Sequence, residues 1–332
     1  MNKQIKLKSR PKGKPTVENF EIVSIPDAKA KEGELIVKAK YISVDPYMRG
    51  RMNEGKSYIA PFEIGKPIEG GVVAEVIVSN HPNFIKGDAI LASMKWQKTQ
   101  TISAQKVTKL DKNITPLSYY LGILGMPGLT AYFGLLDIGK PKTGETIVIS
   151  GAAGAVGMVV GQIGEIKGCR IVGITGSDEK CTYLSNKLQF DEVINYKKTS
   201  NIEAAIRKAC PDGVDIYFDN VGGEISDAVI SQINQKARII ICGQISSYNN
   251  IDLQFGLRPQ SILLKKSALM QGYIVGIYSS RFPEGVEQLT QWLNEGKLRY
   301  KETIVKGFET LPETFIGLFE GKNIGKMLVE IE

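Results

Sequence analysis

The sequence of 332 residues contains one histidine, His81, and four cysteines, all of them at or after position 169. A structural zinc site needs clustered thiolates, and a catalytic zinc site needs a mixed set of cysteine, histidine and carboxylate ligands. The sequence offers neither set and therefore predicts no metal site. A Ser-His-Asp hydrolase would need this same histidine and a G-x-S-x-G motif, which does not occur. His81 stands in the polar turn 79–83 and is expected to be a surface loop residue.

Long hydrophobic runs are also missing. No stretch of about twenty apolar residues occurs, so we expect no membrane-spanning helix. The first eight residues lack the apolar core of a signal peptide, which favours a cytoplasmic location. Cys169, Cys181, Cys210 and Cys242 are far apart in the sequence, as expected for reduced thiols rather than for a disulfide framework.

The chain carries a net positive charge, but its basic residues are spread along the sequence. Lysine and arginine number 42 against 35 aspartate and glutamate residues, which gives a net charge of +7. The only cluster is short, at 3–14, and no nucleic-acid-binding motif with interleaved aromatic residues occurs. We therefore expect anionic small ligands rather than nucleic acid. The length is sufficient for two domains.

The stretch 146–157 is the most informative part of the sequence. The apolar, β-branched run 146–150 predicts a buried parallel strand, the glycines after it permit a tight turn, and 158–167 is predicted to be a helix. Gly154 would let the backbone approach a pyrophosphate, and Gly157 would let the helix pack against the strand, while the helix N-terminus would offer N–H groups to the phosphates. Ala152 departs from G-x-G-x-x-G, because it stands where the first glycine belongs. The stretch predicts a dinucleotide-binding site.

The end of the next strand indicates which dinucleotide binds. Residues 170–175 are predicted to form the second parallel strand, and an acidic residue at its end would bind a free ribose 2′-hydroxyl. The small neutral run 175–177 instead leaves room for a 2′-phosphate, which Lys180 could neutralise one helical turn later. Asp178 and Glu179 could still reach the ribose, but we interpret them as first-turn helix residues favoured by the helix dipole. The pattern favours NADP(H).

The chain divides into two parts with different sequence patterns. The first 125 residues are mostly β, with alternating runs separated by Pro, Gly and Asn turns. A helix is predicted around 125–133, and strands and helices then alternate as in a doubly wound parallel sheet. The predicted strands are 146–150, 170–175, 192–196, 214–220, 237–243 and 269–275, the predicted helices between and after them are 179–188, 202–209, 226–233 and 285–294, and 326–330 is predicted to be a final strand.

Several motifs together resemble one enzyme group. The chain is similar over nearly its whole length to the zinc-independent reductases of the medium-chain dehydrogenase/reductase superfamily. Within it, the chain resembles the leukotriene B4 12-hydroxydehydrogenase/prostaglandin reductase and 2-alkenal (double-bond) reductase group, which includes bacterial curcumin-reductase-like proteins. The motifs are Ser-Val-Asp-Pro-Tyr-Met-Arg-Gly at 43–50, Gly-Met-Pro-Gly-Leu-Thr-Ala-Tyr at 125–132, the turn 151–157, Gly-Ser-Asp-Glu-Lys at 176–180, Tyr-Phe-Asp-Asn-Val-Gly-Gly at 217–223, 242–249 and 321–326.

The resemblance implies a fold and a cofactor site. It implies a GroES-like, mostly β catalytic domain at 1–125 plus 301–332, a Rossmann NADP-binding domain at 126–300, and a homodimer. It also implies that NADPH is the cofactor. The residues implied to hold it are Ala153, Gly154, Ala155, Val156, Gly157, Lys180, Tyr196, Asn220, Cys242, Gly243, Tyr248, Tyr273, Ile274, Val275 and Asn323.

The implied reaction is NADPH-dependent reduction of the carbon–carbon double bond of α,β-unsaturated aldehydes and ketones. The protein must then orient the enone and stabilise negative charge on its carbonyl oxygen, for which neutral hydroxyl donors suffice. The resemblance indicates Tyr248, Tyr47 and Tyr58 as catalytic tyrosines, although any tyrosine can simply pack with its hydroxyl satisfied. Arg49 and Arg51 fit salt bridges and substrate anchors equally well and receive no catalytic role.

Three other functions remain open at this point. A quinone reductase could use the same cofactor domain, and assays with an alkenal and with a quinone would separate the two enzymes. A binding protein that senses NADPH would bind the dinucleotide tightly without oxidising it. Nucleic-acid binding through the lysine excess would depend strongly on salt.

Overall fold

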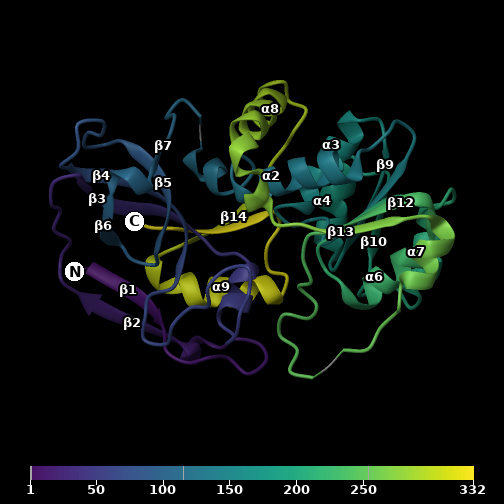
Figure 1. The fold of residues 1–332 in the computed structure, drawn as a ribbon, viewed down its shortest axis with the longest axis horizontal. Coiled ribbons are helices and arrows are strands. Elements are labelled where there is room, and N and C mark those ends of the chain that lie inside the picture. Colours follow the sequence, from purple (N-terminus) through teal and green to yellow (C-terminus); the bar gives the residue numbers. More distant parts are fainter. Residues whose placement is uncertain (1, 115, 253) are drawn as a thin grey trace. The chain divides into compact units, whose positions relative to one another are not determined.

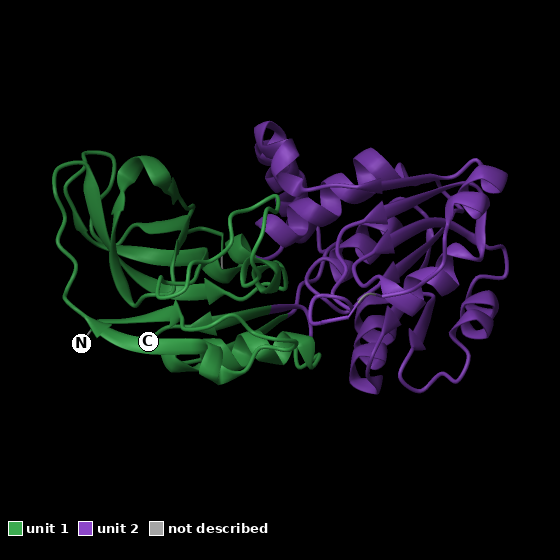
Figure 2. Cartoon of the chain, turned by 60° about the horizontal axis from the view of Figure 1, so that its bottom comes forward, with its two compact units in different colours: residues 1–121, 302–323, 327–332 green, residues 122–301, 324–326 purple. Residues whose placement is uncertain are grey.

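The computed structural model describes residues 2–114, 116–252 and 254–332. The chain folds into two compact units, shown in different colours in Figure 2. Unit 1 consists of residues 1–121, 302–323 and 327–332, and unit 2 consists of residues 122–301 and 324–326.

Unit 2 is built on a parallel sheet (Figure 1). Among the described residues, six strands pair in the order β10-β9-β8-β11-β12-β13, and each neighbouring pair is parallel. From β8 the chain proceeds outward to β10, and it then returns to β11 and proceeds outward to β13, so the order reverses between β8 and β11. This topology confirms the predicted doubly wound sheet. The strands are β8 (Thr146–Ser150), β9 (Arg170–Thr175), β10 (Glu192–Asn195), β11 (Val214–Asp219), β12 (Ile233–Ile241) and β13 (Leu269–Gly272).

Helices cover both faces of this sheet. Helix α3 packs against β8, β9 and α4, whereas α6 packs against β8, β11 and α5. Figure 1 shows α3 and α6 on opposite sides of the sheet. The central residues 147–149 of β8 are therefore completely buried, as a parallel strand between two helical layers should be. The helices of unit 2 are α2 (Met126–Phe133), the π-helix η4 (Gly134–Gly139), α3 (Gly157–Ile166), α4 (Asp178–Leu188), α5 (Ile202–Ala209), α6 (Gly223–Ile230), α7 (Gln260–Lys266), the 3-10 helix η5 (Val275–Arg281) and α8 (Phe282–Asn294).

The predicted beginning of β12 and the predicted end of β13 are wrong. Strand β12 begins at Ile233, four residues before the predicted 237, although its pairing with β11 shifts register between Val214 and Ile216. Lys236 has φ 60 within this irregular stretch, and polar residues there hide the strand pattern. Strand β13 ends at Gly272, and Val275 already belongs to η5.

The predicted helix 226–233 lies three residues earlier in the structure, at Gly223–Ile230. Gly222 and Gly223 have φ angles of 72 and 61, which glycine adopts without steric cost. This positive-φ pair turns the chain directly from the end of β11 into α6. An apolar pattern locates such a helix but does not fix where the turn before it ends.

Unit 1 is mostly β. Among its described residues, a sheet runs in the order β14-β15-β3-β4-β5-β7, with β6 paired to β3 and with a separate β1-β2 pair. The pairs that β3 makes with β4, β6 and β15 are antiparallel. The strands are β1 (Asn2–Leu7), β2 (Phe20–Ile25), β3 (Glu34–Ser43), β4 (Glu69–Ser79), β5 (Ala89–Lys95), β6 (Thr99–Ser103), β7 (Thr108–Lys109), β14 (Glu302–Lys306) and β15 (Lys326–Glu330). The helices are η1 (Val17–Asn19), α1 (Tyr47–Arg51), η2 (Ala104–Lys106), η3 (Leu117–Leu121), η6 (Phe308–Thr310) and α9 (Leu311–Phe319).

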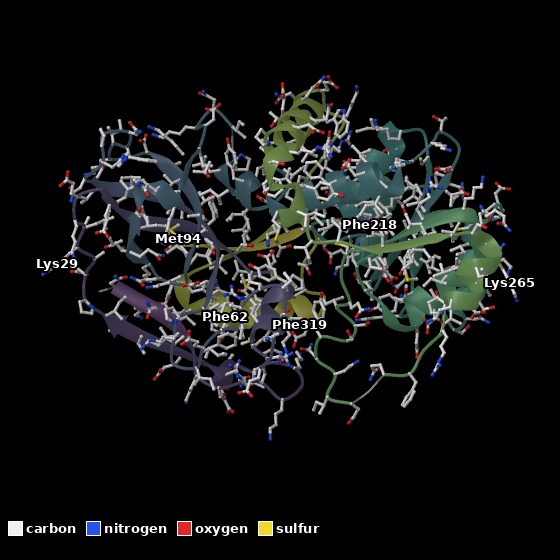
Figure 3. All side chains as sticks on the ribbon, viewed as in Figure 1. Lys29, Phe62, Met94, Phe218, Lys265 and Phe319 are labelled. Atoms are coloured by element: carbon white, nitrogen blue, oxygen red, sulfur yellow. The ribbon has the colours of Figure 1, made fainter. Side chains whose placement is uncertain are left out.

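The core of unit 1 brings the N-terminal strands and the C-terminal helix together. Phe315 of α9 makes edge contacts with Phe20 and with Trp96, and these three side chains are buried. Phe62 and Met94 belong to the same buried cluster, and both are labelled in Figure 3. Unit 1 thus includes residues 302–323 and 327–332 at the end of the chain.

Candidate cofactor and active site

The turn after β8 forms a backbone cradle. Gly151 takes φ 61, and its carbonyl oxygen accepts a hydrogen bond from the Gly154 N–H at 2.9 Å. A Cβ on Gly157 would lie 2.5 Å from the Gly151 oxygen and 2.8 Å from the Ala152 Cα, so only glycine fits there. The positive φ falls on Gly151, which explains why the alanine at 152 is tolerated. The close packing predicted at Gly157 agrees with this geometry.

Gly154 has a different reason to be glycine. A Cβ there would meet only the Gly151 oxygen, at 3.1 Å, and the chain around it has room. Residues 153–156 complete the turn, and the Ala153 oxygen accepts a hydrogen bond from the Gly325 N–H at 2.8 Å. In the first turn of α3, which begins at Gly157, the N–H groups of 158, 159 and 160 donate to the oxygens of Gly154 and Val156. The turn and this helix end can together receive a pyrophosphate.

The other predicted cofactor residues of unit 2 gather at the same edge of the sheet. They follow the carboxyl ends of five neighbouring strands, where a doubly wound sheet binds its ligand. Asn323 is the exception, because it belongs to unit 1. The residues at this edge are Lys180 after β9, Tyr196 after β10, Asn220 after β11, Cys242, Gly243 and Tyr248 after β12, and Tyr273, Ile274 and Val275 after β13.

A buried carboxylate organises the point where the strand order reverses. Asp219, 1% exposed, ends β11, and its Oδ1 accepts hydrogen bonds from the Ser150 Oγ at 2.9 Å and from the Tyr217 hydroxyl at 2.9 Å. The same oxygen accepts from the backbone N–H groups of 221 and 222. Asn220 is oriented in turn, because its Nδ2 donates to the Ser150 oxygen at 2.8 Å. Asp219 therefore fixes the loops on both sides of the switch point.

Basic side chains lie near the ends of β9 and β10. A Cβ on Gly176 would lie 2.9 Å from the Tyr196 ring and 3.3 Å from the Lys197 Cε, so both side chains cover this glycine. Burial, and then the charge of Lys197, lower the pKa of Lys180. Asp178 forms an ion pair with Lys198 and accepts a hydrogen bond from the Asn195 amide at 2.7 Å. Lys180 and Lys197 present positive charge where an NAD-binding protein would carry an acid.

An open cavity of about 570 Å³ adjoins the ends of β12 and β13. Its lining is mainly apolar and includes Cys242, Tyr248, Tyr273 and Ile277. The Tyr273 hydroxyl donates to the Thr130 oxygen at 2.6 Å and also hydrogen-bonds the Cys242 thiol. Burial raises the pKa of Cys242 to about 12, so this thiol stays protonated and serves as a wall of the cavity.

Tyr248 is one of the residues that line this cavity. The phenolic oxygen accepts a hydrogen bond from the Gln244 N–H at 3.2 Å, which leaves the phenolic hydrogen to donate elsewhere. Burial raises the pKa of Tyr248, while the Gln244 N–H opposes the shift and Cys242 and Asp219 add to it. The side chain is therefore a neutral hydrogen-bond donor throughout the physiological pH range.

The other two predicted tyrosines lie together in unit 1. Tyr47 begins α1, and Tyr58 stands in the following loop with 62% of its surface exposed. Burial raises the pKa of Tyr47 well above its usual value, Asp45 adds to the rise, and Arg51 opposes it. Tyr58 also contributes to this pKa, which places the two hydroxyl groups in one electrostatic neighbourhood.

Three functional candidates were not indicated by the sequence patterns. Asp219 and Lys197 stand next to predicted cofactor residues, and Arg51 received no catalytic role. A polar residue at the end of a buried parallel strand was the available signal for Asp219. For Lys197, the signal was a second lysine beside Tyr196.

No metal centre fits this chain as the structure describes it. Across residues 2–114, 116–252 and 254–332, no group of three or more His, Cys, Asp or Glu side chains could hold a metal ion. Within the same ranges, no helix is long and apolar enough to span a membrane.

Comparison with known proteins identifies the family. Residues 3–110 match the family described as the N-terminal domain of oxidoreductase, and residues 155–292 match the family described as zinc-binding dehydrogenase. The second description names zinc, yet its matched range contains no histidine. The zinc of that description therefore does not extend to the residues found here.

Individual relatives match over almost their full length. The NADPH-dependent curcumin reductase of Escherichia coli (strain K12) is 44% identical over 335 residues, covering 99% of this chain and 97% of the relative. The NADP(+)-dependent 2-alkenal reductase of Nicotiana tabacum is 42% identical, with the same coverage. The crystal structure of CurA from Vibrio vulnificus in complex with NADPH superposes with a TM-score of 0.95 at 45% identity and covers 99% of both chains. The chain belongs to the medium-chain dehydrogenase/reductase superfamily, in the group of double-bond reductases that includes the curcumin, 2-alkenal and prostaglandin reductases.

Proposed function

We propose that this protein reduces the carbon–carbon double bond of α,β-unsaturated aldehydes and ketones with NADPH. The observation that carries the proposal is the edge of the unit 2 sheet. A backbone cradle, a pair of lysines and an apolar cavity lined by a neutral tyrosine lie at this edge. The full-length similarity to curcumin and 2-alkenal reductases supports the same reaction.

The cofactor would be held mainly by backbone and by small residues. The turn 151–157 and the start of α3 would receive the pyrophosphate, and Asn220 would border the switch point beside it. Lys180 and Tyr196 would bind the 2′-phosphate over the small Gly176. Residues 242–243, 273–275 and Asn323 complete the proposed set. Bound there, NADPH would supply the hydride that the reaction consumes.

The contribution of the chain to the chemistry would be electrostatic. Negative charge develops on the carbonyl oxygen when the β-carbon of an enone is reduced, and a positioned hydroxyl stabilises it. Tyr248 is our primary candidate donor, because it lines the cavity and its phenolic oxygen is already held by the Gln244 N–H. Tyr47 and Tyr58 of unit 1 are further candidates for donating to the substrate. The raised pKa of both Tyr47 and Tyr248 keeps them protonated for this role.

A substrate panel tests the proposal. Purified protein would be assayed for NADPH oxidation with short enals, enones and simple quinones, and the products would be analysed by mass spectrometry and NMR. We expect enals and enones to lose the double bond and keep the carbonyl group, at rates well above those for quinones. Faster turnover of quinones would indicate a quinone reductase. NADPH binding without turnover of any compound would indicate a binding protein.

We also propose that the protein forms a homodimer. Strand β13 is the last strand of its sheet, and it carries the exposed side chain of Leu269. Unpaired edge strands tend to pair with another chain, and a two-fold axis at this edge would extend the sheet. Light scattering after size-exclusion chromatography should give twice the chain mass of 36.4 kDa, and Leu269→Lys should shift the population toward monomers. A monomer for the unmodified chain would refute this assembly.

These assignments give the two domains separate roles. We propose that 126–300 is the NADP-binding domain and that 1–125 with 301–332 is the catalytic domain. A reducing cytoplasm is the proposed location, supported by the four cysteines, which are all free.

A further inference from the structure

We propose that Arg51 is a positioning residue that holds Tyr47 and the Tyr58 loop together as one donor site. The inference rests on the proposed function, because it concerns the tyrosines assigned there. Arg51 is the last residue of α1, one helical turn after Tyr47. Neither the motif around it nor its charge alone would distinguish it from Arg49 on the same helix.

The side chain of Arg51 fastens the loop that follows α1. Its Nε donates to the Ala60 oxygen at 2.9 Å, and its guanidinium lies 4.0 Å from the centroid of the Phe62 ring. The backbone adds to this connection, because the Phe62 N–H donates to the Arg51 oxygen at 2.6 Å. Phe62 itself is 3% exposed and belongs to the core of unit 1. Arg51 thus ties the loop that carries Tyr58 to a rigid base.

Arg51 follows Tyr47 by four residues and therefore lies on the same face of α1, where its guanidinium opposes the rise that burial causes in the pKa of the Tyr47 hydroxyl. An arginine has donors only, so in this position it can donate only to the phenolic oxygen, which leaves the phenolic hydrogen to donate. The arrangement parallels that of Tyr248, whose oxygen accepts from a backbone N–H. Arg51 also partly offsets the effect of Asp45 on Tyr47. A tyrosine held this way is oriented as a donor toward an oxygen that gains negative charge.

Arg49 provides the contrast on the same helix. Its guanidinium is 3% exposed and donates to the Gly13 oxygen at 2.9 Å and to the Asn53 side chain. These bonds connect α1 to the N-terminal segment and to Asn53. Arg49 is therefore a structural residue, and the two arginines of the motif have separate roles.

The test compares Arg51→Met and Arg51→Lys with Arg10→Lys. Arg10 is the matched control, because its Nη1 donates to the oxygens of 52 and 53, so it anchors the same loop without reaching Tyr47. With an enone and saturating NADPH, Arg51→Met should lower kcat roughly 10- to 100-fold, because displaced catalytic groups lose about this much. The Kd for NADPH should stay unchanged, and Arg51→Lys should recover part of the loss.

Two further readouts separate positioning from general destabilisation. Tyr47→Phe should cost little more in the Arg51→Met background than Arg51→Met alone, because coupled residues are non-additive. In protein labelled with 3-fluorotyrosine, the fluorine resonances of Tyr47 and Tyr58, assigned with Phe variants, should shift in Arg51→Met and stay in place in Arg10→Lys. This second readout needs no enzymatic activity.

The outcomes distinguish the inference from the proposed function. If the unmodified protein reduces no enone, the proposed function fails, and the fluorine shifts alone decide whether Arg51 holds the two tyrosines. If the unmodified protein is active and Arg51→Met behaves like Arg10→Lys in both kcat and fluorine spectra, the inference on Arg51 is overturned. Additive losses for Tyr47→Phe and Arg51→Met would overturn it as well.

Discussion

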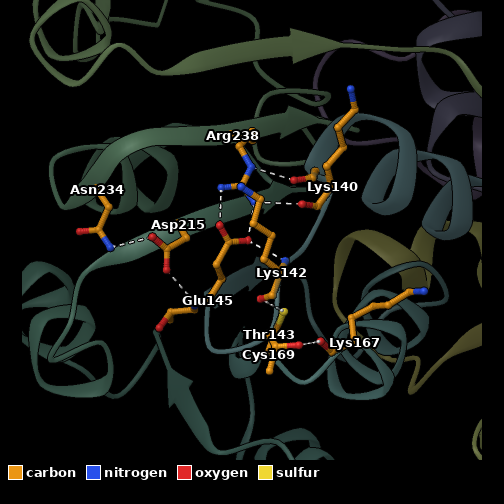
Figure 4. Close-up of polar contacts among 11 residues, drawn as sticks. Lys140, Lys142, Thr143, Glu145, Lys167, Cys169, Asp215, Asn234 and Arg238 are labelled. Atoms are coloured by element: carbon orange, nitrogen blue, oxygen red, sulfur yellow. Dashed lines mark hydrogen bonds and ion pairs between the residues drawn. The ribbon is translucent and has the colours of Figure 1, made fainter.

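The two ends of the unit 2 sheet differ in the kinds of side chain that they carry. At the amino end, charged side chains are paired with one another and with loop carbonyls (Figure 4). Arg238 forms a two-pronged ion pair with Glu145, both side chains being less than one-fifth exposed, and its Nε donates to the Gly139 oxygen at 2.7 Å. Asp215 similarly accepts from the Thr146 N–H at 2.9 Å and from the Asn234 amide. The charged side chains at this end therefore connect neighbouring strands and the loops before them.

At the carboxyl end, glycines and neutral polar groups face a cavity. The buried carboxylate there, Asp219, accepts hydrogen bonds from hydroxyl groups of β8, β11 and α6 and from the backbone N–H groups of 221 and 222. The positive charge of Lys180 lies beside a second lysine rather than in an ion pair. A paired charge mainly stabilises the fold, whereas a cation facing another cation is best satisfied by an anionic ligand. The comparison suggests that changes at the amino end alter stability and that changes at the carboxyl end alter binding and turnover.

The largest effect at the carboxyl end should come from Tyr248→Phe. Removing one donor to a developing oxyanion costs about 3 kcal/mol or more, so kcat should fall at least ~100-fold. The melting temperature should change little, because the hydroxyl makes a single bond with the Gln244 N–H. Steady-state kinetics with several enones checks the prediction. An unchanged kcat would remove Tyr248 from the mechanism.

Two glycines of the turn 151–157 should separate an effect on stability from an effect on NADPH binding. Gly157→Ala should destabilise the protein by about 3 kcal/mol, because its Cβ would collide with the backbone of the turn. Gly154→Ala, whose Cβ meets one oxygen at 3.1 Å, should largely retain stability and lose affinity for NADPH. Urea denaturation and NADPH titration of both variants measure the two effects. Equal losses of stability would show that both glycines are needed for the fold.

Lys180→Ala should separate the two dinucleotides. A charge-assisted bond to phosphate is worth about 1.5–3 kcal/mol, so KM for NADPH should rise roughly 10- to 100-fold while KM for NADH changes little. Lys198→Ala is the matched control, because that lysine pairs with Asp178. An equal rise for both cofactors would contradict the phosphate assignment.

The pKa of Lys180 adds a pH dependence to this prediction. Burial and Lys197 lower that pKa below 10.5, so the free enzyme loses the charge on Lys180 earlier than an ordinary lysine would. The kcat/KM for NADPH should therefore decline on the alkaline side before pH 10.5 is reached. The tyrosine hydroxyls remain protonated there, so kcat itself should hold.

The smallest effect on turnover should come from the amino end. Burial alone would raise the pKa of Glu145, but hydrogen bonds from Arg238 and from the Lys142 N–H lower it overall. Glu145→Gln should cost about 1–3 kcal/mol of stability at pH 7 and leave kcat/KM unchanged. Because the folded carboxylate is favoured, this contribution exists above the unfolded pKa of 4.5 and is lost as pH falls below it. Denaturation at pH 7 and pH 4 tests the sign.

The strands of the unit 2 sheet could be predicted from the sequence because the patterns that indicate them are local. Each of these patterns is carried by a few neighbouring residues. They are the apolar runs, the glycine turn and the absence of an acid after β9. They predicted strands β8 and β9 with the bounds that the structure has. Strand β12 was harder, because its first half contains polar residues and a positive φ at Lys236.

The side-chain connections could not be predicted in the same way. Arg51 lies over the Phe62 ring and shares a face of α1 with Tyr47, and Asp219 collects donors from two strands and a helix. Such contacts depend on how loops fold back onto their strands, which no periodicity encodes. The sequence therefore located the residue types of the site, and the geometry distinguished Arg51 from Arg49.

Hydrogen exchange with and without NADPH tests the contrast between the two ends most directly. The account predicts slower amide exchange on NADPH addition at 151–157, 176–180, 196–197, 220–222 and 242–248, and unchanged exchange at 140–145, 167–170 and 212–215. Protection of the amino-end segments instead, or no protection at the carboxyl-end segments at saturating NADPH, would contradict it.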